Sequence, residues 1–240
     1  MKIIKFYVTN VAVFILALLL AHVPAMAQQL RGNGEMKTED RNVSGFTGIE
    51  VSGGFAVEVT QGSDEGVRLE AEGNLLPNIK TEVKNGVLHI YNDKSLSTNK
   101  GMRAYVTVKE LRKIAISGGV KVTGKSTFKA DKFDLDMSGG SVVILALNTQ
   151  QLTADMSGAS KVELTGTADV MHMEMSGASK VEAADLVAKR VKVGASGASK
   201  VKVYAKEALD INASGASVVY YKGSPTVSSD VSAAARVSKI

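Results

Sequence analysis

The sequence contains no cysteine and no tryptophan. The lack of cysteine excludes a disulfide framework and a cysteine-linked lipid anchor, so stability must come from apolar burial and backbone hydrogen bonds. The lack of tryptophan removes a platform for stacking on sugar rings. The chain also lacks a basic block, because acidic and basic residues alternate along it. This pattern argues against nucleic acid as a partner.

The first 27 residues have the pattern of a cleavable signal peptide. Lys2 and Lys5 precede an apolar run over residues 11–21, and Ala25-Met-Ala27 supplies small residues for cleavage. The apolar run is about half of the ~20 residues that span a bilayer, and no later segment is long and apolar enough. We therefore expect export to the periplasm, the cell surface or the extracellular space, with no membrane span in the mature chain.

A repeat organises the rest of the chain. The run Ser157-Gly-Ala-Ser-Lys-Val recurs at Ser176 and at Ser196. Weaker copies begin at four other serines: Ser52, Ser117, Ser138 and Ser214. From Ser117 onward the leading serines lie 21, 19, 19, 20 and 18 residues apart. A period of about 20 residues is typical of a solenoid and is too short for a strand–helix–strand unit.

Apolar residues hold fixed positions relative to each leading serine. The third and first residues before the serine are apolar from Ile114 onward, and every copy has a valine five residues after the serine. Polar residues alternate with them, so each copy predicts two short strands joined at a glycine corner that needs positive φ. In-register stacking would place Met137, Met156 and Met175 in one row. We predict an all-β fold, a right-handed parallel β-helix or β-solenoid with coils of about 18–21 residues.

The sequence divides into three parts after the signal peptide. We predict a flexible lead-in over residues 28–42, a β-helical domain over residues 43–225 and a C-terminal cap or tail over residues 226–240. An insertion at about residues 61–112 contains four alternating segments, two of them joined by the hairpin signal Asn85-Gly86. Among the corners, we expect Gly177 to be required and Gly223, near the end of the repeat, to be more tolerant.

The order of these segments resembles a known bacterial family. The features that carry the resemblance are the opening Phe46–Phe55, the segment Gly73–Val83 with Asn85–Ile90, the Ser-Gly repeats and the closing Tyr221–Pro225. In this respect the chain is similar to the putative auto-transporter adhesin, head GIN domain family. The resemblance implies a β-helical head and a surface or envelope location, and it supplies no active site.

Two rows of charged residues are the candidate sites. Asp136, Asp155 and Glu174 would stack on one face, where they either bind a hard cation such as calcium or pair with lysines, Lys161 and Lys180 among them. The pairing is the interpretation that we favour. The second row, Lys161, Lys180 and Lys200, would attract an anionic glycan or lipid headgroup, but the interleaved Glu163 and Glu182 predict a charge-balanced face.

A catalytic role for the repeated serines would need a base beside each of them. His89 and His172 are single occurrences that do not recur with the repeat. We therefore predict no catalytic residues, no cofactor and no metal ligand. The hypothesis is a noncatalytic exported module for envelope structure or adhesion, with envelope or host-surface glycans or proteins as partners. The alternative is a polysaccharide-processing enzyme or a glycan-binding protein on the same scaffold.

Overall fold

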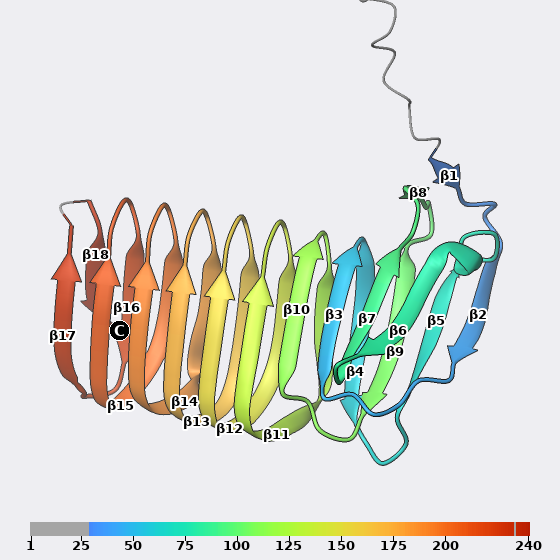
Figure 1. Ribbon diagram of the computed structural model, residues 1–240. Helices are drawn as coiled ribbons and strands as arrows, with labels where there is room; N and C mark the ends of the chain where they lie inside the picture. The colour runs from blue at the N-terminus through green and yellow to red at the C-terminus, as the bar shows by residue number, and fades with distance from the viewer. Residues whose placement is uncertain (1–28, 233) are drawn as a thin grey trace, which may run out of the picture.

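The computed structural model describes residues 29–232 and 234–240, and the predicted signal peptide lies outside them. Strands wind around one long axis and stack into a β-solenoid (Figure 1). The strands nearest the viewer rise and those behind descend as the chain advances from right to left, which is a right-handed winding. The predicted fold class is therefore confirmed. In the described part of the chain no helix has the length and hydrophobicity of a membrane span.

The N-terminal part contains ten strands and one short 3₁₀ helix. They are β1 (Leu30–Arg31), β2 (Met36–Arg41), β3 (Gly48–Gly53), β4 (Phe55–Gln61), β5 (Gly66–Glu72), η1 (Leu76–Asn78), β6 (Ile79–Lys84), β7 (Val87–Asn92), β8 (Leu96–Ser97), β9 (Met102–Val108) and β10 (Lys113–Gly118). The regular coils follow. They comprise β11 (Lys121–Met137), β12 (Val142–Met156), β13 (Lys161–Met175), β14 (Lys180–Ala195), β15 (Lys200–Ala213), β16 (Val218–Lys222), β17 (Thr226–Val231) and β18 (Arg236–Lys239).

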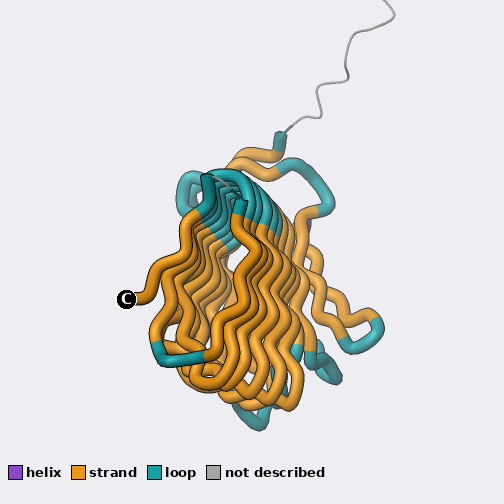
Figure 2. Tube along the Cα trace, turned by 90° about the vertical axis from the view of Figure 1, so that its left-hand side faces the viewer, coloured by secondary structure: helices purple, strands orange, loops and turns teal. Residues whose placement is uncertain are grey.

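Each regular coil contributes to two sheets. Its half before the glycine corner lies in the front sheet of Figure 1, in line with β6, β7, β3, β10 and β17. Its half after the corner lies in the rear sheet, in line with β2, β5, β9, β4, β16 and β18. Figure 2 looks along the axis and shows the coils nested behind one another, with the corners aligned along one edge. Residues on either side of a corner therefore face opposite sides of the molecule.

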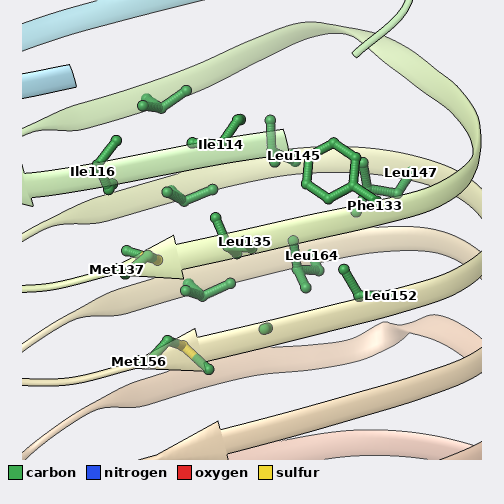
Figure 3. Close-up of a cluster of buried hydrophobic side chains, with 14 of the residues drawn as sticks. Ile114, Ile116, Phe133, Leu135, Met137, Leu145, Leu147, Leu152, Met156 and Leu164 are labelled. Atoms are coloured by element: carbon green, nitrogen blue, oxygen red, sulfur yellow. The ribbon is translucent and has the colours of Figure 1, made fainter. Parts of the chain in front are cut away.

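The predicted rows are confirmed residue by residue. Ile116 lies beside Met137, Met137 beside Met156 and Met156 beside Met175 in the parallel ladders. The valine row runs without interruption from the first coil, through Val57, Val122, Val143, Val162, Val181, Val201 and Val219. These side chains are buried and form one continuous core, part of which Figure 3 shows. Equivalent side chains of successive coils therefore pack on one another at the ~4.8 Å spacing of strands.

The corners stack as closely as the strands. Gly158 and Gly177 have φ of +80° and +83°, and the amide of Ala178 donates to the carbonyl of Gly158 at 2.8 Å. In the five copies from Ser138 onward the second serine is buried, and its hydroxyl donates to the backbone, as from Ser160 Oγ to the carbonyl of Ser157 at 3.0 Å. The serines thus satisfy corner carbonyls, as expected for serine in turns.

The insertion has the predicted strands. β6 and β7 form an antiparallel hairpin around Asn85 and Gly86, whose φ values are +51° and +75°. β5 lies antiparallel to both β2 and β9, whereas β9 joins β4 in parallel. The insertion therefore extends both sheets of the solenoid rather than forming a separate layer.

The structure adds strands at both ends of the predicted β-helical domain. The segment predicted as a flexible lead-in contains β2, which pairs with β5 over residues 36–41. The predicted tail continues the solenoid, because β17 pairs with β15 and β18 with β16 in the same parallel register. Both segments are largely polar, so backbone pairing rather than an apolar pattern makes them strands.

A buried carboxylate fixes the N-terminal segment. Glu72 on β5 is fully buried, and its carboxylate accepts hydrogen bonds from Thr98 Oγ1 at 2.6 Å and from the amide of Gly34 at 2.8 Å. The bond from Thr98 is the main cause that lowers the pKa of Glu72, although desolvation opposes the shift. One side chain thus joins β5 to the segment before β2 and to the loop before β9.

We expect Glu72→Gln to loosen both segments at neutral pH. Hydrogen exchange of the Gly34 and Asn99 backbone amides should be faster by roughly tenfold or more, because the side-chain amide of glutamine is a weaker acceptor than the carboxylate. The folded-state pKa is below the ordinary 4.5, so the wild-type stabilisation is complete at neutral pH and is lost as pH falls below that value. The exposed Glu35→Gln is the control, and equal exchange in both variants would contradict the prediction.

Candidate functional site

A groove runs along the front sheet beside the corners. Its volume is about 720 Å³, and it crosses five successive coils from Ser117 to Ser196. We call it the front groove. Its lining comprises the carboxylates Glu50, Asp136, Asp155 and Glu174, the methionines Met137, Met156 and Met175, the serines Ser117, Ser138, Ser157, Ser176 and Ser196, and Lys113, Ala115 and Ile116. Three chemically different rows therefore run parallel to the solenoid axis.

The predicted acidic row forms one side of the front groove. Asp136 lies beside Asp155, and Asp155 beside Glu174, in the ladders of three consecutive coils. Their side chains project from one face at the strand spacing instead of converging. Within residues 29–232 and 234–240, no three His, Asp or Glu side chains gather closely enough to hold a metal ion.

The partners of the acidic row are not the predicted lysines. Lys113 Nζ lies 2.8 Å from Asp136 Oδ2, and His172 Nε2 lies 3.0 Å from Glu174 Oε1. The hydrogen bond to Asp136 raises the pKa of Lys113. Lys161 and Lys180 follow the corners, so they lie on the rear sheet and cannot serve this row. Asp155 lies between these two contacts and forms no ion pair with a described residue.

The serine row borders the front groove at the corners, whereas the side chains of Met137, Met156 and Met175 are almost fully buried. Ser157 Oγ donates to the carbonyl of Met137 at 3.4 Å, and Ser196 Oγ donates to the carbonyl of Met175 at 3.1 Å. Each of these hydroxyls keeps its oxygen lone pairs as acceptors for a ligand. The contacts of His172 go to Glu174 rather than to a serine, so the arrangement is not that of an activated nucleophile.

A second hollow, of about 240 Å³, continues this face toward the hairpin. Glu50 on β3, His89 on β7 and Glu82 on β6 lie side by side in the ladders. His89 Nδ1 is 3.6 Å from Glu50 Oε2, and the Tyr91 hydroxyl donates to Glu82 Oε1 at 2.7 Å. Hydrogen bonds from Lys84 first and then Tyr91 lower the pKa of Glu82. The sequence did not predict that these residues continue the face of the acidic row, because β6 and β7 lie outside the repeat.

The lysine row lies on the rear sheet, as a charge-balanced surface. Lys161, Lys180 and Lys200 stack in register, and Glu163 stacks on Glu182 in the neighbouring row. Lys180 Nζ and Lys202 Nζ each lie 3.0 Å from a Glu182 oxygen. Burial acts to raise the pKa of Glu182, but the bonds from the two lysines outweigh it and lower the pKa. Lys200 Nζ lies 5.5 Å from the centre of the Tyr220 ring.

Comparison with solved structures finds the same fold in several bacterial proteins. A putative adhesin from Bacteroides fragilis is 25% identical with a TM-score of 0.84, covering 88% of this chain and 100% of its own. A putative lipid binding protein from Parabacteroides distasonis is 21% identical, with a TM-score of 0.73 and coverages of 89% and 100%. A putative adhesin from Parabacteroides merdae is 18% identical, with a TM-score of 0.71 and coverages of 88% and 99%.

A search of curated proteins finds no match. By contrast, the sequence profile described as "Putative auto-transporter adhesin, head GIN domain" matches residues 45–225. This range begins just before β3 and ends just after β16, so it includes both the insertion and the regular coils. The chain therefore belongs to the putative auto-transporter adhesin, head GIN domain family.

Proposed function

We propose that the protein is a noncatalytic, exported adhesion module of the cell envelope, and that its front groove binds an extended, uncharged glycan. The observation that carries the proposal is the front groove itself, whose serine row repeats in five coils and whose carboxylate row repeats in three consecutive coils, at Asp136, Asp155 and Glu174. An extended polymer can contact several coils at once, so weak contacts that recur along the axis add together. The adhesin family and the predicted signal peptide support a role outside the cytoplasm.

The charges of the front groove favour hydroxyl-rich ligands. Carboxylates are strong acceptors, and hydroxyl groups of sugars are the donors that they would bind. Glu50, Asp136, Asp155 and Glu174 line the groove together with one lysine, Lys113, so an anionic polymer would meet repulsion. A glycosidase needs two carboxylates that flank the scissile bond, whereas this row projects from one face.

Asp155 is the residue through which we test the proposal. It is exposed, and it forms no ion pair with a described residue, so its carboxylate is available to a ligand. We expect Asp155→Asn to weaken binding to dextran about ten- to hundredfold, the cost of replacing a charged acceptor by a neutral one. Isothermal titration calorimetry of purified protein against dextran and polygalacturonate provides the measurement.

Glu163→Gln is the matched control, because Glu163 is also exposed and also belongs to a stacked acidic row, but on the rear sheet. It should bind dextran as the wild type does. Stronger binding to polygalacturonate than to dextran would contradict the proposed ligand class. Release of sugar products that stops in Asp155→Asn would contradict the noncatalytic role. Protease treatment of intact cells would then distinguish surface adhesion from a periplasmic role.

A further inference from the structure

A second groove lies on the outward face of the rear sheet, where β5 pairs with β2 and β9 (Figure 1). We call it the rear groove, and its volume is about 780 Å³. Asp40 lies beside Arg68, and Arg68 beside Tyr105, so one row of side chains crosses all three strands. The rear groove shares no lining residue with the front groove and lies on the opposite sheet, so the two are separate candidate sites.

The charges of the rear groove balance. Its charged lining consists of two acidic and two basic residues, Asp40, Glu70, Arg41 and Arg68. Arg68 Nε donates to Asp40 Oδ1 at 2.8 Å, and both side chains are exposed. This bond leaves the two terminal nitrogens of Arg68 and Oδ2 of Asp40 without a hydrogen bond to any described residue. Two adjacent hydroxyl groups fit this pair, since one can donate to the carboxylate while the other accepts from the guanidinium.

Tyr105 supplies an aromatic surface in a chain that has no tryptophan. Its hydroxyl donates to Glu70 Oε2 at 2.8 Å, and Arg103 Nη1 donates to the other oxygen of Glu70 at 2.9 Å. The ring is therefore held at both ends, by its own strand β9 and by β5, and it loses little freedom when a ligand binds. Its aromatic face is apolar, so it can cover the C–H face of a sugar ring whose hydroxyl groups reach Asp40 and Arg68.

Gly66 keeps the rear groove open. It begins β5 beside Thr107, and its side-chain position faces outward because the next residue, Val67, faces the core. Its φ lies outside the left-handed region, and a Cβ atom there would have no atom beyond its immediate neighbours within 4 Å. Neither the backbone nor the packing therefore requires glycine at this position. Glycine in a strand often marks a place where a ligand approaches closely, and Gly66 lines the same groove as Tyr105.

We propose that the rear groove is a second binding site, for a short uncharged oligosaccharide. Tyr105 forms the surface on which one sugar ring stacks, and Asp40 with Arg68 binds adjacent hydroxyl groups. The site is open and offers one aromatic contact, so the dissociation constant for a trisaccharide should be on the order of 1 mM. The inference does not rest on the ligand proposed for the front groove. Together with that groove, which faces the opposite side, the site would let one molecule join two glycan strands.

Amide NMR spectra recorded during a titration with cellotriose, an uncharged glucose trisaccharide, test the site. The backbone amides of Thr38, Gly66 and Thr107, which line the rear groove, should shift along one saturation curve. Tyr105→Ala should weaken this binding roughly ten- to hundredfold, the range expected when an aromatic contact surface is lost. Asp155→Asn should leave it unchanged, because that side chain lines the front groove, so the result is independent of dextran binding there. Absence of saturable shifts at the three amides would overturn the proposal.

Two further variants separate a ligand site from a structural role. Gly66→Val fills the groove without backbone strain, and valine favours strands, so the melting temperature should not fall while cellotriose binding weakens about tenfold or more. Tyr220→Ala is the matched control, because Tyr220 also faces outward on the rear sheet but lies outside the groove, with Lys200 Nζ 5.5 Å from its ring centre. It should bind cellotriose as the wild type does. Wild-type binding by Gly66→Val, or equal weakening in Tyr105→Ala and Tyr220→Ala, would overturn the proposal.

Discussion

Replacing Gly177 with valine should lower the free energy of unfolding by about 3–5 kcal/mol. Two effects add. Gly177 has a φ of +83°, where a residue with a side chain costs about 1–3 kcal/mol. A Cβ atom on Gly177 would also lie 2.5 Å from the carbonyl oxygen of Gly158 and 3.1 Å from its nitrogen. These are backbone atoms of the stacked coil, so the clash cannot be relieved by a rotamer change.

Gly101 offers a matched control for this prediction. Its φ is +82°, but no atom lies within 4 Å of the position of its Cβ. Gly101→Val should therefore cost about 1–3 kcal/mol, from backbone strain alone. Thermal unfolding measures both, with about 2–4 °C per kcal/mol for a chain of this size. Hydrogen exchange should also show faster opening of the coils on both sides of Gly177. Equal melting temperatures for the two variants would contradict the stacked-corner explanation.

The structure argues against the tolerance predicted for Gly223. Its φ is +96°, and a Cβ atom there would overlap the carbonyl oxygen of Ala205 in the preceding coil. Position near the end of the repeat suggested a weaker constraint, because a terminal coil has fewer neighbours. However, β17 and β18 continue the solenoid past this residue, so Gly223 lies at an internal bend rather than at the end.

The regular coils could be predicted because each one has the same environment. In an in-register stack, a position that faces the core in one coil faces it in all of them, as Val143, Val162 and Val181 do. The sequence therefore reports the same burial pattern many times, and the period, the corner and the rows follow from it. The hairpin at Asn85-Gly86 could be predicted for a different reason, since its turn depends on local φ preferences.

The strands at the two ends could not be predicted, because they are held by backbone hydrogen bonds to neighbouring strands and have no alternating apolar residues. β2 pairs with β5 while its side chains are mostly exposed and charged. β17 has no exposed–buried alternation, because its core-facing residues are not covered by a described coil. Polar segments without a regular spacing of apolar residues are predicted to be loops, because that spacing is the main sequence signal of a strand.

The candidate site was found in part. The acidic row of Asp136, Asp155 and Glu174 is in register as predicted, because it belongs to the repeat. Its ion partners were assigned wrongly because sequence proximity places Lys161 beside Asp155, whereas the corner turns Lys161 to the other sheet. His89 lies on the same face only because β7 pairs with β3 over a long distance in the sequence. β7 lies outside the repeat, so the repeat period does not predict this pairing.

Replacing Phe133 with alanine should destabilise the protein by about 3–5 kcal/mol, the usual cost of truncating a buried phenylalanine. Phe133 is 1% exposed and lies against Leu152 in the ladder, in the region shown in Figure 3. The same row continues through Met171 and Val191, so its later members are smaller than Phe133. The ring therefore fills space that no neighbouring coil can supply, and a cavity would remain after truncation.

Phe133→Leu is the matched variant, because it places in this coil the residue that Leu152 provides in the next one. It should cost about 1 kcal/mol, since most of the apolar volume is kept. Chemical denaturation of both variants measures the difference, with the slope against denaturant concentration checked for constancy. If Phe133→Ala lowered the free energy of unfolding no more than Phe133→Leu, the neighbouring coils would have moved in to fill the space of the missing ring. The continuous core would then be deformable at this point, and tight side-chain packing would not be what holds the solenoid together there.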